Sequence, residues 1–125
     1  MPIQCRLVDH SVAKKPGDMF YAPWLVEGED AKYYLEKYLS LEYKRDILGK
    51  RPPIMVVLPT GTDFCVDCAY CGSQDGHGWT VTGDAPDITV SPSINHWAGS
   101  DRCWHGYLQN GILTDDLEGR KYADA

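Results

Sequence analysis

The sequence predicts an α+β fold, with a small, mostly antiparallel β-sheet, one main helix and long loops. Two observations favour this class. A single stretch in the first half has helical periodicity, and short β-branched runs separated by turn signals follow Pro53. The chain has 125 residues, of which 43% are hydrophobic. This length and composition suit one folded domain that spans residues 1–125.

The first half of the chain contains the predicted helix. Residues 3–8 are expected to form a first strand, and residues 15–18 a turn. Between residues 29 and 39, apolar side chains recur at helical spacing with charged side chains on the other side, which predicts the main helix. Ser40 is placed to cap a second, short helical segment that ends at Leu48.

Strand signals dominate after Pro53. The first of these runs is apolar at every position, as in a strand at the centre of a sheet. The last two runs flank Asn110-Gly111, a pair that favours a type I′ turn because both residues tolerate positive φ. The predicted strands are residues 54–58, 63–66, 79–82, 88–90, 105–109 and 112–114.

Charge is distributed unevenly along the chain. The net charge of −6 divides into +1 for residues 1–51, −6 for residues 52–101 and −1 for residues 102–125. The middle segment has six aspartates and no lysine or arginine. Its field would attract cations and repel phosphate, so neither nucleic acid nor an anionic membrane surface is an expected partner.

The cysteines require an explanation. No export signal or membrane-spanning run is visible, and the longest apolar run is residues 54–58. We therefore expect a cytoplasmic protein, where thiols normally stay reduced, and an odd count of five cannot pair completely. Metal binding or simple burial is the expected role.

The spacing of cysteine and histidine predicts a metal site. Cys65, Cys68 and Cys71 form a C-x2-C-x2-C cluster, and Cys103 with His105 forms a C-x-H pair. A turn can direct closely spaced thiolates at one ion, and residues i and i+2 of a strand point to the same face. We expect Cys68, Cys71, Cys103 and His105 to bind a structural zinc that staples a loop, with Cys65 as the alternative ligand.

Alternative roles for these residues stay open. The thiols could be loosely placed without any metal, and an iron–sulfur cluster would need a further cysteine where Asp75 stands. His77 or His105 could activate a neighbouring thiol, but no third group that would orient the histidine is identifiable. Ser93 near His105 invites comparison with a serine nucleophile, but no G-x-S-x-G pattern surrounds it. We therefore predict no catalytic residue.

Four stretches of the chain are similar to known proteins: residues 49–54, 78–83, 88–94 and 105–111. Together they resemble small uncharacterised proteins encoded by tailed bacteriophages and prophages. This resemblance covers about residues 16–119. Relatives of the phage type often lack cysteines where Cys68, Cys71 and Cys103 stand, which implies that the fold itself does not require zinc.

Two elements carry a second resemblance. One element is Thr-x-x-Pro-Ser-Ile at residues 89–94, and the other is Cys-x-His-x-x-x-x-Asn-Gly at residues 103–111. Both are similar to a bacterial family of unknown function, which contains cysteines and is found near ubiquitin-like conjugation genes. Both describe turns and strands more than chemistry. The resemblance therefore implies a setting and no particular activity.

The function expected from these observations is that of a binding module. We expect a phage-encoded accessory protein with a structural zinc that binds a host or defence protein, as an anti-defence inhibitor would. One alternative is a small enzyme, a hydrolase or nucleotide-modifying protein with an open metal position or a Cys–His pair. Another is a virion or assembly component. A protein partner is expected, and the sequence does not indicate the oligomeric state.

Overall fold

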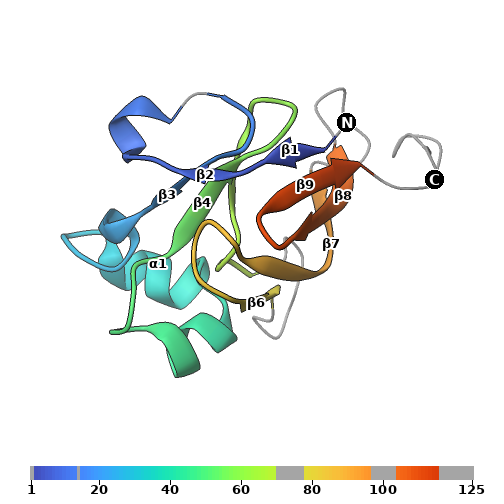
Figure 1. Ribbon diagram of the computed structural model, residues 1–125. Coiled ribbons are helices and arrows are strands. Elements are labelled where there is room, and N and C mark those ends of the chain that lie inside the picture. Colours follow the sequence, from blue (N-terminus) through green and yellow to red (C-terminus); the bar gives the residue numbers. More distant parts are fainter. Residues whose placement is uncertain (1, 14, 70–77, 97–103, 116–125) are drawn as a thin grey trace.

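The structure is a computed structural model that describes residues 2–13, 15–69, 78–96 and 104–115 (Figure 1). Within these ranges it contains β-sheets and one α-helix, which confirms the α+β class. The strands form two sheets instead of the single sheet expected, with orders β1-β9-β8-β7-β6 and β2-β3-β4-β5. The strands are β1 (Ile3–Gln4), β2 (Arg6–Leu7), β3 (Asp18–Tyr21), β4 (Ile54–Val57), β5 (Asp63–Cys65), β6 (Thr80–Thr82), β7 (Thr89–His96), β8 (Trp104–Gln109) and β9 (Ile112–Asp115).

The predicted first strand is divided between the two sheets. β1 pairs antiparallel with β9, whereas β2 pairs parallel with β3. Cys5 lies between them, is 2% exposed, and donates its backbone N–H to the carbonyl oxygen of Gly111 at 2.7 Å. The chain therefore passes from one sheet to the other at Cys5. A pattern of alternating residues cannot reveal this change of partner, because it depends on distant strands.

The strands predicted after Pro53 all form, but one is longer than expected, since residues 88–90 were predicted and β7 spans Thr89–His96. β4 pairs with β5, β6 with β7, and β8 with β9, all antiparallel. Asn110 has φ 50° and Gly111 has φ 75°, so both central residues of the last hairpin have the positive φ that a type I′ turn requires.

The four-stranded sheet lies between the five-stranded sheet and the helical segments. Successive residues of β5 divide between two cores: Phe64 belongs to the core between the sheets, and Cys65 to a smaller cluster against the helical side. Met55 and Val56 in β4 divide in the same way. A sheet covered on both faces explains why β4 is apolar at every position, as the sequence predicts.

The helical segments are shorter than predicted. α1 spans Ala31–Lys37, within the predicted range 29–39, and contributes no fully buried side chain. A π-helical segment, η3, spans Tyr43–Ile47. The Ser40 hydroxyl accepts a hydrogen bond from the Tyr43 backbone N–H at 3.1 Å, which confirms its capping role. No helix of the described residues is long and apolar enough to cross a membrane.

Candidate functional site

The five-stranded sheet carries a serine–histidine pair. Ser93 Oγ in β7 lies 3.1 Å from Nε2 of His105 in β8, within hydrogen-bonding distance. Both side chains are half-buried, so the pair is partly accessible from outside. In the tautomer that carries its proton on Nδ1, His105 accepts the hydrogen bond that the serine hydroxyl donates. In this arrangement an imidazole can take the proton from an attacking hydroxyl.

Strand alternation places both side chains on the face of the sheet that points away from the core. Along β8, fully buried residues alternate with half-buried ones, and His105 is half-buried. Along β7, Ile94 is fully buried in the core between the sheets, so the preceding Ser93 points the other way. Ile94 pairs with Gly106, which brings the neighbours of both residues together across the two strands.

An irregularity in β7 sets the position of Ser93. Between two successive backbone pairs, β7 advances four residues while β8 advances two. Pro92 lies inside this bulge and has no N–H to donate to a ladder. Bulges commonly redirect a side chain, and this one ends just after Ser93. Ser93 is the diagonal neighbour of His105, whose directly paired residue is Asn95. The flanking pairs are Val90 with Leu108 and Ile94 with Gly106.

Gly106, beside His105, is a position where a larger residue does not fit. A Cβ atom there would overlap the carbonyl oxygen of Thr114 and the indole ring of Trp104. The constraint is one of space, because both neighbours are part of the packed sheet. Close packing on both sides of Gly106 therefore fixes the strand that carries the histidine.

Trp79 supports the bulge from the core. Its indole Nε1–H donates a hydrogen bond to the Ser93 carbonyl oxygen at 3.3 Å. The ring is 7% exposed and meets the ring of Phe64 edge to face, with centroids 4.8 Å apart and an interplanar angle of 86°. Since Phe64 belongs to β5, Trp79 connects the bulge of one sheet to a strand of the other.

The predicted zinc ligands do not form one site among the described residues. Cys71 and Cys103 lie outside these residues, as does His77. His105 is placed against Ser93. No group of three or more His, Cys, Asp or Glu side chains that could hold a metal ion occurs in the part of the chain that the structure describes. The zinc site therefore stays a prediction.

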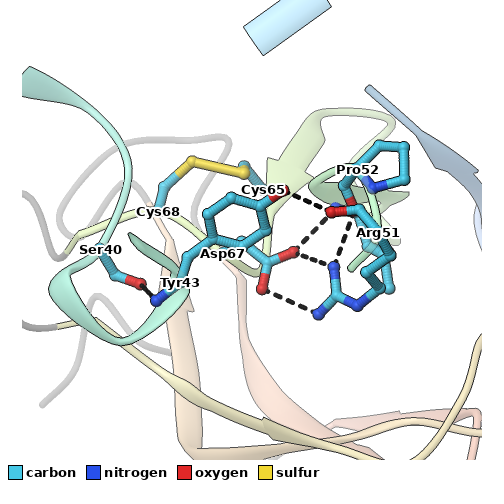
Figure 2. The surroundings of a disulfide bond; sticks show 8 residues. Ser40, Tyr43, Arg51, Pro52, Cys65, Asp67 and Cys68 are labelled. Atoms are coloured by element: carbon cyan, nitrogen blue, oxygen red, sulfur yellow. Dashed lines mark hydrogen bonds and ion pairs between the residues drawn. A yellow bond between two sulfur atoms is a disulfide. The ribbon is translucent and has the colours of Figure 1, made fainter. Parts of the chain in front are cut away.

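Cys65 and Cys68 form a disulfide bond (Figure 2). The expectation of reduced thiols is wrong for this pair in the structure, because the turn of the C-x-x-C segment brings the two Cα atoms to 5.5 Å, a separation that a disulfide spans. In this state neither sulfur is a thiolate that could bind zinc. Cys5 is the other cysteine among the described residues; it is free and buried.

An ion pair between a buried carboxylate and a partly buried guanidinium lies beside the disulfide. The Asp67 carboxylate receives two hydrogen bonds from the Arg51 guanidinium, at 2.7 and 3.1 Å, and one from the Ile54 backbone N–H at 2.9 Å (Figure 2). Arg51 therefore neutralises Asp67, one of the six aspartates of residues 52–101, and the attraction of this segment for cations is weaker than its charge alone predicts. Burial raises the pKa of Tyr43, whose hydroxyl donates to the Arg51 carbonyl oxygen, to about 12.

The sequence does not predict a catalytic role for Ser93 or His105, and it favours His105 as a zinc ligand. Ser93 has no G-x-S-x-G pattern around it. In the structure it stands in an irregular strand, whereas that pattern is typical of a serine in a strand-to-helix turn. The available signal was Pro92, because a proline inside an otherwise regular strand marks a bulge or an edge. That proline indicates an irregular strand, but it does not indicate that His105 of the neighbouring strand lies beside Ser93.

Part of the chain matches a known family. Residues 54–114 match the family model described as "Bacterial ubiquitination-like system serine protease (BubE)". This stretch is just under half of the chain and runs from β4 into β9, so it includes both Ser93 and His105. No curated protein and no solved structure matches the chain.

The match agrees with one of the two resemblances noted in the sequence. It supports the distant similarity to a bacterial family found near ubiquitin-like conjugation genes. It does not bear on the phage proteins, which stay a resemblance. Residues 54–114 are thus similar to a family of serine proteases from bacterial ubiquitination-like systems.

Proposed function

We propose that the protein is a serine protease of a bacterial ubiquitination-like system, with Ser93 as the nucleophile and His105 as the general base. The observation that carries this proposal is the 3.1 Å separation of Ser93 Oγ and His105 Nε2 on an accessible face of the sheet. The matched stretch supports it independently, because the family is described as a serine protease and the stretch contains both residues.

The proposed reaction is acyl transfer to serine followed by hydrolysis. Ser93 Oγ attacks the carbonyl carbon of an amide bond while His105 Nε2 takes the hydroxyl proton. When the tetrahedral intermediate collapses, the carbon–nitrogen bond breaks and His105 returns the proton to the leaving amine. Water then attacks the acyl-serine ester, with His105 again accepting a proton. The products are a carboxylic acid and an amine, and Ser93 is regenerated.

The proposed substrate is a protein. The family description refers to a ubiquitination-like system, and ubiquitination joins proteins through amide bonds. The chain itself has a net charge of −6, and residues 52–101 have no lysine or arginine. Charge complementarity favours a partner that presents a basic surface near the bond to be cut.

Covalent labelling tests the proposal directly. A fluorophosphonate probe phosphonylates an activated serine with loss of fluoride, and peptide mapping locates the label. We expect the label on Ser93, no labelling of Ser93→Ala, and a rate at least about 100-fold lower for His105→Ala, because the hydroxyl then lacks its base. Ser91→Ala is the matched control, since Ser91 is an exposed serine on the same strand. Labelling of Ser93→Ala at the wild-type rate would contradict the proposal.

The phage setting and the anti-defence role remain predictions from the sequence. An inhibitor that acts by occupying a partner does not use the Ser93 hydroxyl. If Ser93→Ala inhibits the defence partner as strongly as the wild type, the binding role is favoured. If the variant is folded and has lost this inhibition, the protease is favoured. Circular dichroism and thermal unfolding establish that this variant is folded.

A further inference from the structure

We propose that the Cys65–Cys68 disulfide is a redox switch for the Ser93–His105 pair and acts through Trp79. The inference rests on the proposed function, since it concerns the regulation of that site. It also assigns Trp79 a positioning role, because the indole contacts the main chain of the nucleophile and not the reacting atoms.

The first connection between the disulfide and Trp79 runs through the main chain. Ala69, next to Cys68, forms an isolated antiparallel bridge with Gly78. A Cβ atom on Gly78 would overlap the Cys68 carbonyl oxygen, so the two backbones are in direct contact. Because Gly78 immediately precedes Trp79, the disulfide-closed turn holds the segment that carries the indole.

The second connection runs through the rings. Phe64, adjacent to Cys65, packs edge to face on Trp79 with centroids 4.8 Å apart. The residues on the two sides of the disulfide thus hold Trp79 at two places: Phe64 contacts its ring, and Cys68 packs against the glycine before it. We call this arrangement of residues 64–69 around residues 78–79 the tryptophan clamp.

The clamp ends at the nucleophile. The Trp79 indole donates to the Ser93 carbonyl at 3.3 Å, and the Ser93 hydroxyl contacts His105 at 3.1 Å. A rotation or shift of the indole removes this donor from the bulge. Misplacement of a reacting group by about 1 Å can lower a rate by about 100-fold.

Reduction would move the clamp for a steric reason. A dithiol supplies two electrons and two protons, the sulfur–sulfur bond becomes two thiols, and the dithiol leaves as its own disulfide. The two sulfurs must then separate to van der Waals contact. Cys65 and Cys68 are 3% and 4% exposed and packed with Tyr43 (Figure 2), so there is little free space to absorb this separation. The Cys68 main chain, which faces Gly78, has to shift.

The test measures the rate of fluorophosphonate labelling of Ser93 in the full chain, oxidised or reduced with dithiothreitol. Alkylation and mass spectrometry verify the redox state of each sample. We expect reduction to lower the rate about 10- to 100-fold and reoxidation to restore it. Cys65→Ser/Cys68→Ser is expected to be slow and insensitive to reductant. Cys5→Ala, which removes a buried cysteine that is not part of the disulfide, is the matched control and is expected to keep the full response.

Trp79→Phe tests the pathway. This variant keeps an aromatic ring against Phe64 but has no N–H for the Ser93 carbonyl. We expect slow labelling in the oxidised state and little further change on reduction. A variant that labels at the wild-type rate and responds fully to reductant would overturn the role of Trp79.

A structural readout separates this inference from the proposed function. The Trp79 indole N–H resonance, assigned from the spectrum of Trp79→Phe, is expected to shift and to exchange faster with solvent on reduction. If Ser93 is never labelled but the resonance responds, the protease proposal fails and the clamp is retained. If Ser93 is labelled equally fast in both redox states, or the resonance does not respond, the switch is overturned and the protease proposal stands on its own labelling result.

Discussion

The two sheets differ in how they are built and in what they carry. The four-stranded sheet is covered on both faces, has regular pairing between β4 and β5, and lies beside the Cys65–Cys68 disulfide and the Arg51–Asp67 ion pair. The five-stranded sheet has the bulged strand β7, and its outer face carries Ser93 and His105. Ser93 therefore stands on an irregular strand and His105 on the strand next to it, and Trp79 connects the irregular strand to the regular sheet behind it.

Asp67→Ala is expected to have the largest effect on the regular layer. It leaves the buried Ile54 N–H and the partly buried Arg51 guanidinium without the carboxylate that binds both, and leaving buried donors unsatisfied costs about 1–3 kcal/mol, and more where the donor is charged. Urea unfolding measures the loss. The control is Asp63→Ala, an exposed aspartate in β5, for which we expect a change below about 0.5 kcal/mol. A loss of less than about 1 kcal/mol for Asp67→Ala would show that the ion pair does not hold this layer.

Gly106→Ala tests the five-stranded sheet in the same way. The added methyl group overlaps Thr114 and Trp104, and overpacking of this kind costs about 1–3 kcal/mol. Because the sheet relieves the overlap by moving β8, we expect Ser93 labelling to fall as well. Gln109→Ala, at an exposed position of the same strand, is expected to leave the stability and the rate of Ser93 labelling unchanged. Unaltered labelling in a destabilised Gly106→Ala would show that the pair tolerates movement of the strand.

Local signals explain which parts of the fold the sequence predicts. The hairpin at Asn110-Gly111 follows from the φ preferences of two adjacent residues, and the cap at Ser40 from its own hydroxyl. The split of residues 3–8 between two sheets depends on the partners β9 and β3, which are far away in the sequence. No local pattern contains that information.

The candidate site has the same limitation. Ser93 and His105 are twelve positions apart, and they meet because the bulge changes the register between β7 and β8. Cysteine spacing gave a stronger local signal and favoured a zinc site. The structure joins Cys65 and Cys68 in a disulfide, which the spacing did not indicate, and the zinc site stays a prediction.

Cys5 offers a test at the junction of the two sheets. Burial raises the pKa of its thiol from 9.0 to about 11. As the pH rises, the unfolded chain therefore loses this proton first, and stability falls between about pH 9 and 11. We expect a contribution on the order of 1–2 kcal/mol over this interval. The difference between Cys5→Ala and wild type isolates the contribution of this thiol from that of other groups such as Tyr43. If the unfolding free energies of the two proteins fall in parallel as the pH rises, burial does not protect the Cys5 thiol.

Metal removal is expected to have the smallest effect on Ser93 labelling. It tests whether His105 acts as the base for Ser93 or as a zinc ligand. The imidazole that accepts the Ser93 proton at Nε2 cannot offer the same nitrogen to a zinc ion, and Cys68 in a disulfide has no thiolate to offer. We therefore expect a chelator to leave the labelling rate of the oxidised chain unchanged. The zinc prediction makes the opposite claim, that one zinc per chain is retained, that Cys71→Ala or Cys103→Ala releases it, and that its removal unfolds the loop. Metal analysis of the oxidised and reduced chains separates the two expectations. Zinc bound only after reduction would mean that the cysteines hold metal as thiolates and position Ser93 when they are joined as a disulfide.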